Sequence, residues 1–93
     1  MPNNLFFSYD LVEQEDRKEQ IDKAIQSMGN ATPLTKNSWY VNSPITAHEA
    51  TRRLSGLLTD EDILVVADTS NDQSAWFNLE EKKARRITQN WKM

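Results

Sequence analysis

The sequence predicts a single α+β domain in which short strands alternate with amphipathic helices. Two observations support this fold class. Apolar residues recur at strand spacing in several short segments, and at helical spacing in the segments between and after them. A chain of 93 residues can bury one sheet covered on one side by helices, but not two cores. We therefore expect residues 1–93 to form one domain that ends in a helical extension over about residues 78–92.

The first predicted strand is the apolar run Leu5–Asp10, which contains no Gly or Pro. Strand alternation places Leu5, Phe7 and Tyr9 on one face and the intervening residues, including Asp10, on the other. A carboxylate at the end of such a strand either caps the next turn or is placed to bind a metal ion or water. Both interpretations of Asp10 stay open at this point.

The next segment predicts a helix over about residues 15–28, because Ile21, Ala24, Ile25 and Met28 fall at i, i+3, i+4 and i+7. Acidic residues at its start match the helix dipole. Gly29 is expected to end the helix in a left-handed conformation.

Two short strands are predicted after this helix. Residues 31–35 contain Pro33, which cannot donate to a ladder and so indicates an edge strand. Residues 38–41, rich in aromatic and β-branched side chains, predict a firmer strand with Trp39 and Val41 on one face and Ser38 and Tyr40 on the other.

The second helix has the clearest local signal in the sequence. Thr46 and Glu49 have the spacing of a capping box, which predicts a helix starting after Thr46 and ending near Thr59. His48 falls in its first turn on the polar side. No second His or Cys accompanies it, so we expect a solvated side chain.

The run Ile63–Ala67 predicts a strand buried on both faces. Residues 75–77 either add a short edge strand or fold two rings over the core. A last helix is expected to be capped by Asn78. Leu79, Lys83, Ile87 and Trp91 then follow at i+4 spacing, which predicts that Trp91 packs on the sheet or on a partner subunit.

The predicted order is strand, helix, strand, strand, helix, strand, which is the ferredoxin-like βαββαβ sandwich. Right-handed crossovers place the first strand between the third and the fourth, with both helices on one face of an antiparallel sheet. Asp10 then lies near Ser38 and Asp62, and Asp68 lies at the far end. The other face would expose Phe6 and neighbouring aliphatic residues, so we expect a homodimer.

Composition excludes several classes of protein. A net charge of −3 and a pI near 5.0 argue against binding nucleic acid through bulk positive charge. The absence of Cys and the single His exclude thiolate and histidine-rich metal sites and leave only an oxygen-ligand site for Mg, Mn or Ca. No signal peptide or membrane span is recognisable, and we expect a cytoplasmic protein.

Several segments resemble a known family: Phe7–Leu11, Met28–Gly29, Asn37–Val41 and Ile63–Asp68. Together they are similar to the small CRISPR-associated adaptation protein that forms the dimeric centre of the spacer-integration complex, and to the virulence-associated protein D ribonucleases. The resemblance covers roughly residues 4 to 70. It implies a ferredoxin-like dimer in which Asp10 from each subunit holds a divalent ion across the two-fold axis, and in which Ser38 matches the Ser that opens the third strand.

Three functional hypotheses follow. The first is a homodimeric scaffold, for instance a toxin-antitoxin component, whose acidic residues engage a basic protein partner. The second is a Mg- or Mn-dependent endonuclease in which Asp10 holds the metal and Ser38 and Tyr9 orient water or phosphate. The third uses the basic stretch Lys82–Arg86 with Trp91 to contact nucleic acid, although Glu80 and Glu81 are placed to pair with those charges. The acidic residues of the first hypothesis are Glu13, Glu15, Asp16, Glu19, Asp60, Glu61 and Asp62.

Overall fold

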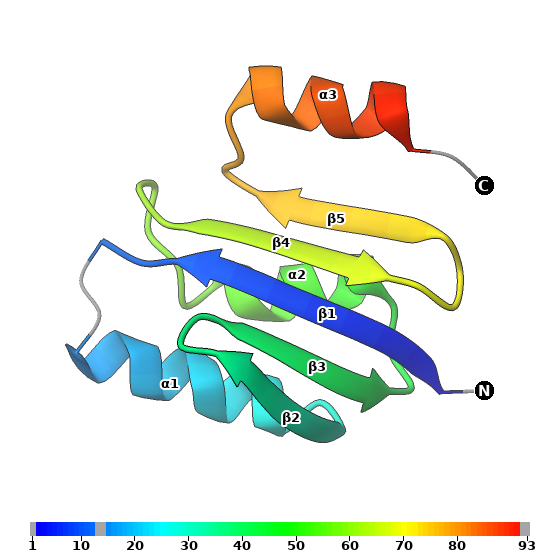
Figure 1. The fold of residues 1–93 in the computed structure, drawn as a ribbon. Coiled ribbons are helices and arrows are strands. Elements are labelled where there is room, and N and C mark those ends of the chain that lie inside the picture. Colours follow the sequence, from blue (N-terminus) through cyan, green and yellow to red (C-terminus); the bar gives the residue numbers. More distant parts are fainter. Residues whose placement is uncertain (1, 13–14, 92–93) are drawn as a thin grey trace.

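A computed structural model describes residues 2–12 and 15–91 of the chain (Figure 1). This part of the chain is an α+β fold with one antiparallel sheet. Its elements are β1 (Asn3–Asp10), α1 (Glu15–Gln26), β2 (Asn30–Thr35), β3 (Ser38–Ser43), α2 (Ala47–Ser55), β4 (Ile63–Asp68), β5 (Gln73–Phe77) and α3 (Glu81–Asn90).

The strands follow the order β2-β3-β1-β4-β5, and every neighbouring pair is antiparallel. As expected, β1 lies between β3 and β4. Asp10 is paired with Ile63 at the start of β4, whereas Asp68 is paired with Leu5 at the opposite end of the sheet. β5 continues the sheet as an edge strand, which decides between the two alternatives that the sequence allowed for residues 75–77.

The hydrophobic core lies on one face of the sheet. Leu5, Phe7 and Tyr9 of β1 are at most 4% exposed, and they alternate with exposed residues, which confirms the predicted alternation. Ile25 of α1 and Leu54 of α2 are fully buried in the same cluster. Because both helices share one core with this face of β1, they cover the same side of the sheet; Figure 1 shows α2 behind β1 and β4.

The second face of the sheet has no helix over it in the described residues. The prediction that residues 63–67 are buried on both faces is therefore wrong. Leu64 and Val66 are fully buried under the helices. The alternate residues Ile63, Val65 and Ala67 are only half-buried. An apolar run in a strand indicates that both faces of the strand are apolar. It does not indicate whether another element covers each face.

The start of α2 is confirmed. The Oγ1 atom of Thr46 accepts a hydrogen bond from the backbone N–H of Glu49 at 3.1 Å. The Glu49 carboxylate pairs with Arg53 at 2.6 Å, one turn further along the helix. The helix ends at Ser55, earlier than predicted, and the chain turns at Gly56.

Gly29 follows α1 for a reason other than the one predicted, because its φ is not left-handed. A Cβ atom on Gly29 would overlap the carbonyl oxygen of Asn42 in β3. Glycine is therefore required here for the close approach of two backbone segments.

Asn78 does not cap α3, contrary to the prediction. It has a φ of 63°, a left-handed conformation that Asn tolerates better than most residues. Its Nδ2 atom donates to the carbonyl oxygens of Asp60 and Asp62, the latter at 3.1 Å. Asn78 thus ties the end of β5 to the start of β4, and α3 begins later, at Glu81. None of the helices over residues 15–91 is long and apolar enough to cross a membrane.

Candidate functional site

The feature of the molecule with the clearest potential for interaction is the helix-free face of the sheet, which we call the uncovered face. Strand register places the following residues on it: Phe6, Ser8, Asp10, Ser38, Tyr40, Ile63, Val65, Ala67, Ser74 and Trp76. Phe6 is 40% exposed, and its ring packs against that of Tyr40 with centroids 5.2 Å apart. Asp10 is the one charged residue of this set, and it lies at the end of β1.

Two of the three residues predicted to form a catalytic site share the uncovered face. Asp10 is exposed, and its carboxylate makes no hydrogen bond or ion pair with residues of the described chain. Ser38 is paired with Ser8, two residues before Asp10 on β1, and its Oγ lies 2.6 Å from Oγ1 of Thr35. Asp10 and Ser38 are therefore diagonal neighbours on one face.

Tyr9 points to the opposite, helix-covered side and belongs to a separate polar network. Its hydroxyl donates to Asp22 Oδ1 at 2.6 Å and accepts from Lys18 Nζ at 3.0 Å. The indole Nε1 of Trp39 donates to the same Asp22 oxygen at 3.0 Å. Tyr9 is consequently not positioned to orient a ligand held by Asp10 in the same subunit.

These contacts shift the pKa values of the network in the directions expected for a satisfied structural cluster. Burial, and then the hydrogen bond to Asp22, raise the pKa of Tyr9. Burial also acts to raise the pKa of Asp22, but hydrogen bonds from Lys18, Tyr9 and Trp39 outweigh it, so that pKa is lowered. The hydrogen bond to Asp22 raises the pKa of Lys18. The network therefore keeps Lys18 and Asp22 charged over the pH range in which most proteins are folded.

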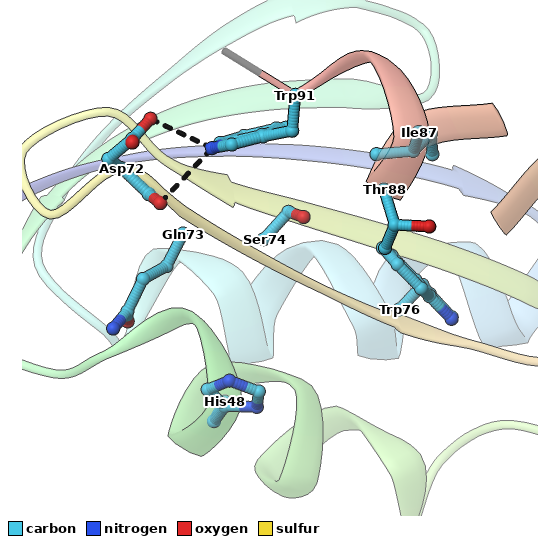
Figure 2. Close-up of a pocket in the computed structure, with 8 residues that line it drawn as sticks. All are labelled: His48, Asp72, Gln73, Ser74, Trp76, Ile87, Thr88 and Trp91. Carbon is cyan, nitrogen blue, oxygen red and sulfur yellow. Dashed lines mark hydrogen bonds between the residues drawn. The ribbon is translucent and has the colours of Figure 1, made fainter. Parts of the chain in front are cut away.

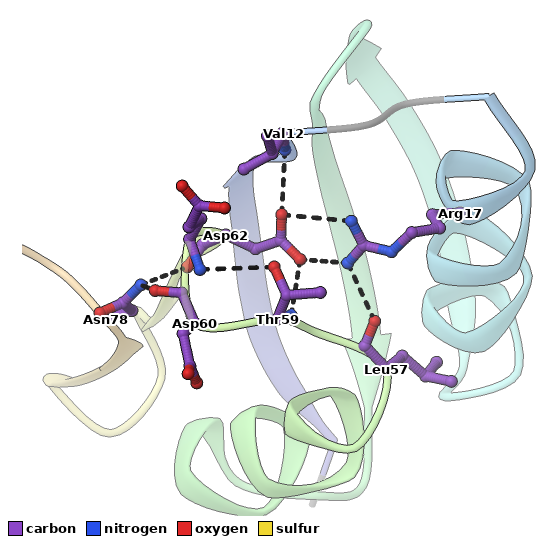
Figure 3. A network of polar contacts seen from close by, with 8 residues as sticks. Val12, Arg17, Leu57, Thr59, Asp60, Asp62 and Asn78 are labelled. Atoms are coloured by element: carbon purple, nitrogen blue, oxygen red, sulfur yellow. Dashed lines mark hydrogen bonds and ion pairs between the residues drawn. The ribbon is translucent and has the colours of Figure 1, made fainter.

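Asp62 lies in a different environment from the one that the sequence predicts. The sequence places it on an acidic surface, yet its side chain is fully buried. It accepts hydrogen bonds from the backbone N–H groups of Val12 and Thr59, at 2.9 and 2.7 Å, and forms an ion pair with Arg17 (Figure 3). The hydrogen bonds from Arg17 are the main cause that holds the pKa of Asp62 far below its usual range; burial opposes them, and the backbone donors add to them.

The remaining acidic residues of the predicted surface are partly confirmed as exposed. Asp16, Glu19, Asp60 and Glu61 are exposed, and Glu19 pairs with Lys23 at 3.1 Å. Glu13 and the side chain of Glu15 lie outside the described residues.

A pocket at the edge of β5 was not foreseen from the sequence. It has a volume of about 400 Å³ and is lined by residues of α2, the β4–β5 turn, β5 and the end of α3 (Figure 2). His48, which is exposed as predicted, lines this pocket and also a neighbouring cavity of about 620 Å³ that includes Arg52. The eight lining residues of the first pocket are His48, Asp72, Gln73, Ser74, Trp76, Ile87, Thr88 and Trp91.

The C-terminal helix packs less than predicted. α3 has no buried residue, and Trp91 is 37% exposed, so the expectation of a substantially buried Trp91 is wrong for a single copy of the chain. The side chain is nevertheless held in place, because its indole Nε1 donates to Asp72 Oδ1 at 2.8 Å. In the basic stretch, Arg85 pairs with Glu81 at 2.8 Å, as the charge spacing predicted.

Within residues 2–12 and 15–91, no group of three or more His, Cys, Asp or Glu side chains is arranged to hold a metal ion. A metal site at Asp10 would therefore require ligands from a second copy of the chain. Comparisons of the chain with family models, with curated proteins and with solved structures found no match.

Proposed function

We propose that this chain is a small interaction protein that pairs with a second copy of itself through the uncovered face. The observation that carries this proposal is the aromatic and aliphatic character of that face. The exposed Phe6 ring, the adjacent Tyr40 and the half-buried Val65 and Ala67 lie side by side across three strands. A contiguous apolar patch of this kind is uncommon on soluble monomers and marks an interaction site.

The charge distribution supports the same proposal. Asp10 lies at one end of the uncovered face, so the centre of the face can be buried without desolvating a charge. Two sheets of this kind pack face to face about 10 Å apart. A two-fold axis through the centre would bring each Phe6–Tyr40 pair against its counterpart.

We further propose that the sheet is a ferredoxin-like plan extended by β5, and that the chain is related to the CRISPR-associated adaptation family. The strand order β2-β3-β1-β4 and the antiparallel pairing of these strands support the fold. The Tyr9–Asp10 sequence at the end of β1 supports the relationship. A cytoplasmic scaffold, for instance in a toxin-antitoxin pair, is the role that this relationship suggests, with the exposed acidic residues available to a basic protein partner.

The dimer is tested by measuring the solution mass at several concentrations by sedimentation. The wild type is expected at twice the monomer mass of 10.8 kDa. Phe6→Glu should shift the protein to the monomer, whereas Leu57→Glu should not, because Leu57 is exposed to a similar extent, 38% against 40%, but lies beyond the end of α2. A monomeric wild type at about 100 µM, or equal effects of the two substitutions, would refute the proposal.

A second candidate function, metal-dependent cleavage of RNA or DNA, is favoured by one observation. The Asp10 carboxylate is exposed and has no protein partner within the described chain, so it caps no described backbone group and is open to a ligand. Two such carboxylates brought together in a dimer would supply oxygen ligands for one Mg or Mn ion, with Ser38 on the same face.

The nuclease is tested with short RNA and DNA substrates in the presence of Mn. If it is correct, Asp10→Asn lowers the rate at least about a hundredfold, and the control Asp60→Asn, which removes another exposed carboxylate, leaves it unchanged. Equal cleavage by wild type and Asp10→Asn would exclude Asp10 from the chemistry. Detection of a dimer without any cleavage would leave the scaffold as the function.

A further inference from the structure

Asp72, in the turn between β4 and β5, is held in an unusual way. Its φ of 54° is left-handed, which few residues other than Gly, Asn and Asp adopt. Its Oδ1 and its carbonyl oxygen both accept from the indole Nε1 of Trp91, at 2.8 and 3.2 Å. Its Oδ2 is buried and has no hydrogen-bond partner in the described chain. Leaving a carboxylate oxygen without a donor is costly, so a ligand in the pocket that Asp72 lines would be stabilised by donating to this oxygen.

The walls of the pocket suit an apolar stem that ends in a positive charge. Figure 2 shows the Trp91 indole edge-on above Ser74, so that one face of the ring is turned toward Ser74. Trp76 and Ile87 form the opposite end of the same pocket. Indole faces attract cations, and the aliphatic wall favours a hydrocarbon chain.

We propose that this pocket binds a primary alkylammonium group, either the side chain of a lysine or a free aliphatic amine. The ammonium donates to Oδ2 of Asp72, and the hydrocarbon stem lies between the two indoles. Arginine fits less well, because its planar fork is matched to two acceptor oxygens and Oδ1 is already engaged by Trp91. A quaternary ammonium has no N–H to donate. An anion would meet an unpaired carboxylate.

The approach to Asp72 requires only a local adjustment. Oδ2 is covered in the structure, so the ammonium reaches it only after the side chains around it shift. The neighbouring cation Arg52 lines the adjoining cavity and not this one. Asp72 and the α3 residues of the pocket lie outside the uncovered face, whereas strand register places Ser74 and Trp76 on it, opposite Ala67 and Val65.

The test uses the full chain and NMR signals of the indole N–H groups. Trp91 is the direct reporter, because its Nε1 contacts Asp72. The probes are n-butylamine and the peptide acetyl-Gly-Lys-Gly-amide. Their neutral counterparts are n-butanol and the same peptide with norleucine in place of lysine, which has a similar stem but no ammonium. We expect a saturable shift of the Trp91 signal with the two ammonium probes and none with the neutral ones.

Substitutions test whether binding of the ammonium probes requires the Asp72 carboxylate. Asp72→Asn, which tolerates the same φ and keeps an acceptor for Trp91, should weaken binding about ten- to a hundredfold. Trp76→Leu should weaken it about threefold, and Asp60→Asn should leave it unchanged. Tighter binding of the peptide than of butylamine would assign the site to a protein lysine, and equal binding would assign it to free amines. No saturable shift at about 20 mM, equal shifts with the neutral probes, or full affinity in Asp72→Asn would overturn the proposal.

Discussion

Asp62 provides the most direct test of how the fold is held together. The substitution Asp62→Asn preserves volume but removes the charge and replaces one acceptor oxygen with an NH₂ group. That group then faces donors from the backbone of Val12 or Thr59 and from Arg17. Hydrogen bonds to a charged acceptor contribute about 1.5 to 3 kcal/mol, and leaving a buried charge unpaired costs about 3 to 5 kcal/mol. Arg17 retains 22% exposure, so we expect a loss of about 2 to 4 kcal/mol.

The measurement is urea unfolding followed by Trp fluorescence and far-UV circular dichroism. Asp60→Asn is the matched control, since its exposed carboxylate makes no contact within the described chain, and it should change the free energy of unfolding by less than about 0.5 kcal/mol. An unchanged m-value would show that the variants unfold to the same extent as the wild type. A loss below about 1 kcal/mol for Asp62→Asn would refute the assignment of this network as a main stabilising contact.

The same variant has a defined pH dependence. The folded state lowers the pKa of Asp62 below its unfolded value of about 3.9, so the unfolded chain takes up the proton first as the pH falls. The stability contributed by Asp62 is therefore complete above about pH 5 and is lost progressively at lower pH. The difference between wild type and Asp62→Asn should narrow between about pH 5 and pH 2. A difference that stays constant over this range would contradict the lowered pKa.

Three other predictions concern the fold. Gly29→Ala should destabilise the protein by about 3 kcal/mol or more, because its methyl group overlaps the carbonyl oxygen of Asn42, whereas Gly56→Ala, with open space around it, should have little effect in the same urea assay. Thr46→Ala should cost about 1 kcal/mol through loss of the N-cap of α2, and a change below about 0.3 kcal/mol would contradict that role. Truncation after Asn78 should lower the free energy of unfolding by about 1 kcal/mol or less, because α3 buries no residue; loss of cooperative unfolding would show that α3 is essential.

The parts of the fold that the sequence predicted well depend on local patterns. The alternation in β1 and the capping box at Thr46 involve residues within one strand or one helical turn, so their periods can be read directly. The position of Asp10 near Ser38 could also be predicted from the sequence, because the rules of strand connection allow few orders for four strands.

The errors involve residues whose environment is set by distant segments. Asp62 belongs to an acidic run that looks solvated, but its partner Arg17 lies 45 residues earlier in the chain. Trp91 continues an apolar stripe, yet α3 has little to pack on apart from the edge of β5 and the turn that carries Asp72. The pocket at that edge is lined by Asp72, whose left-handed conformation is not indicated by any sequence periodicity.

The central position of β1 has a consequence for how the chain acquires its structure. β1 is the first strand in sequence, yet its two neighbours begin at Ser38 and Ile63, and the pairing of Leu5 with Asp68 closes a loop of more than sixty residues. Long loop closures are entropically costly and slow the search for the native pairing. Until β4 arrives, one edge of β1 presents unpaired backbone groups. We expect this interval to be the period in which the chain is most prone to aggregate.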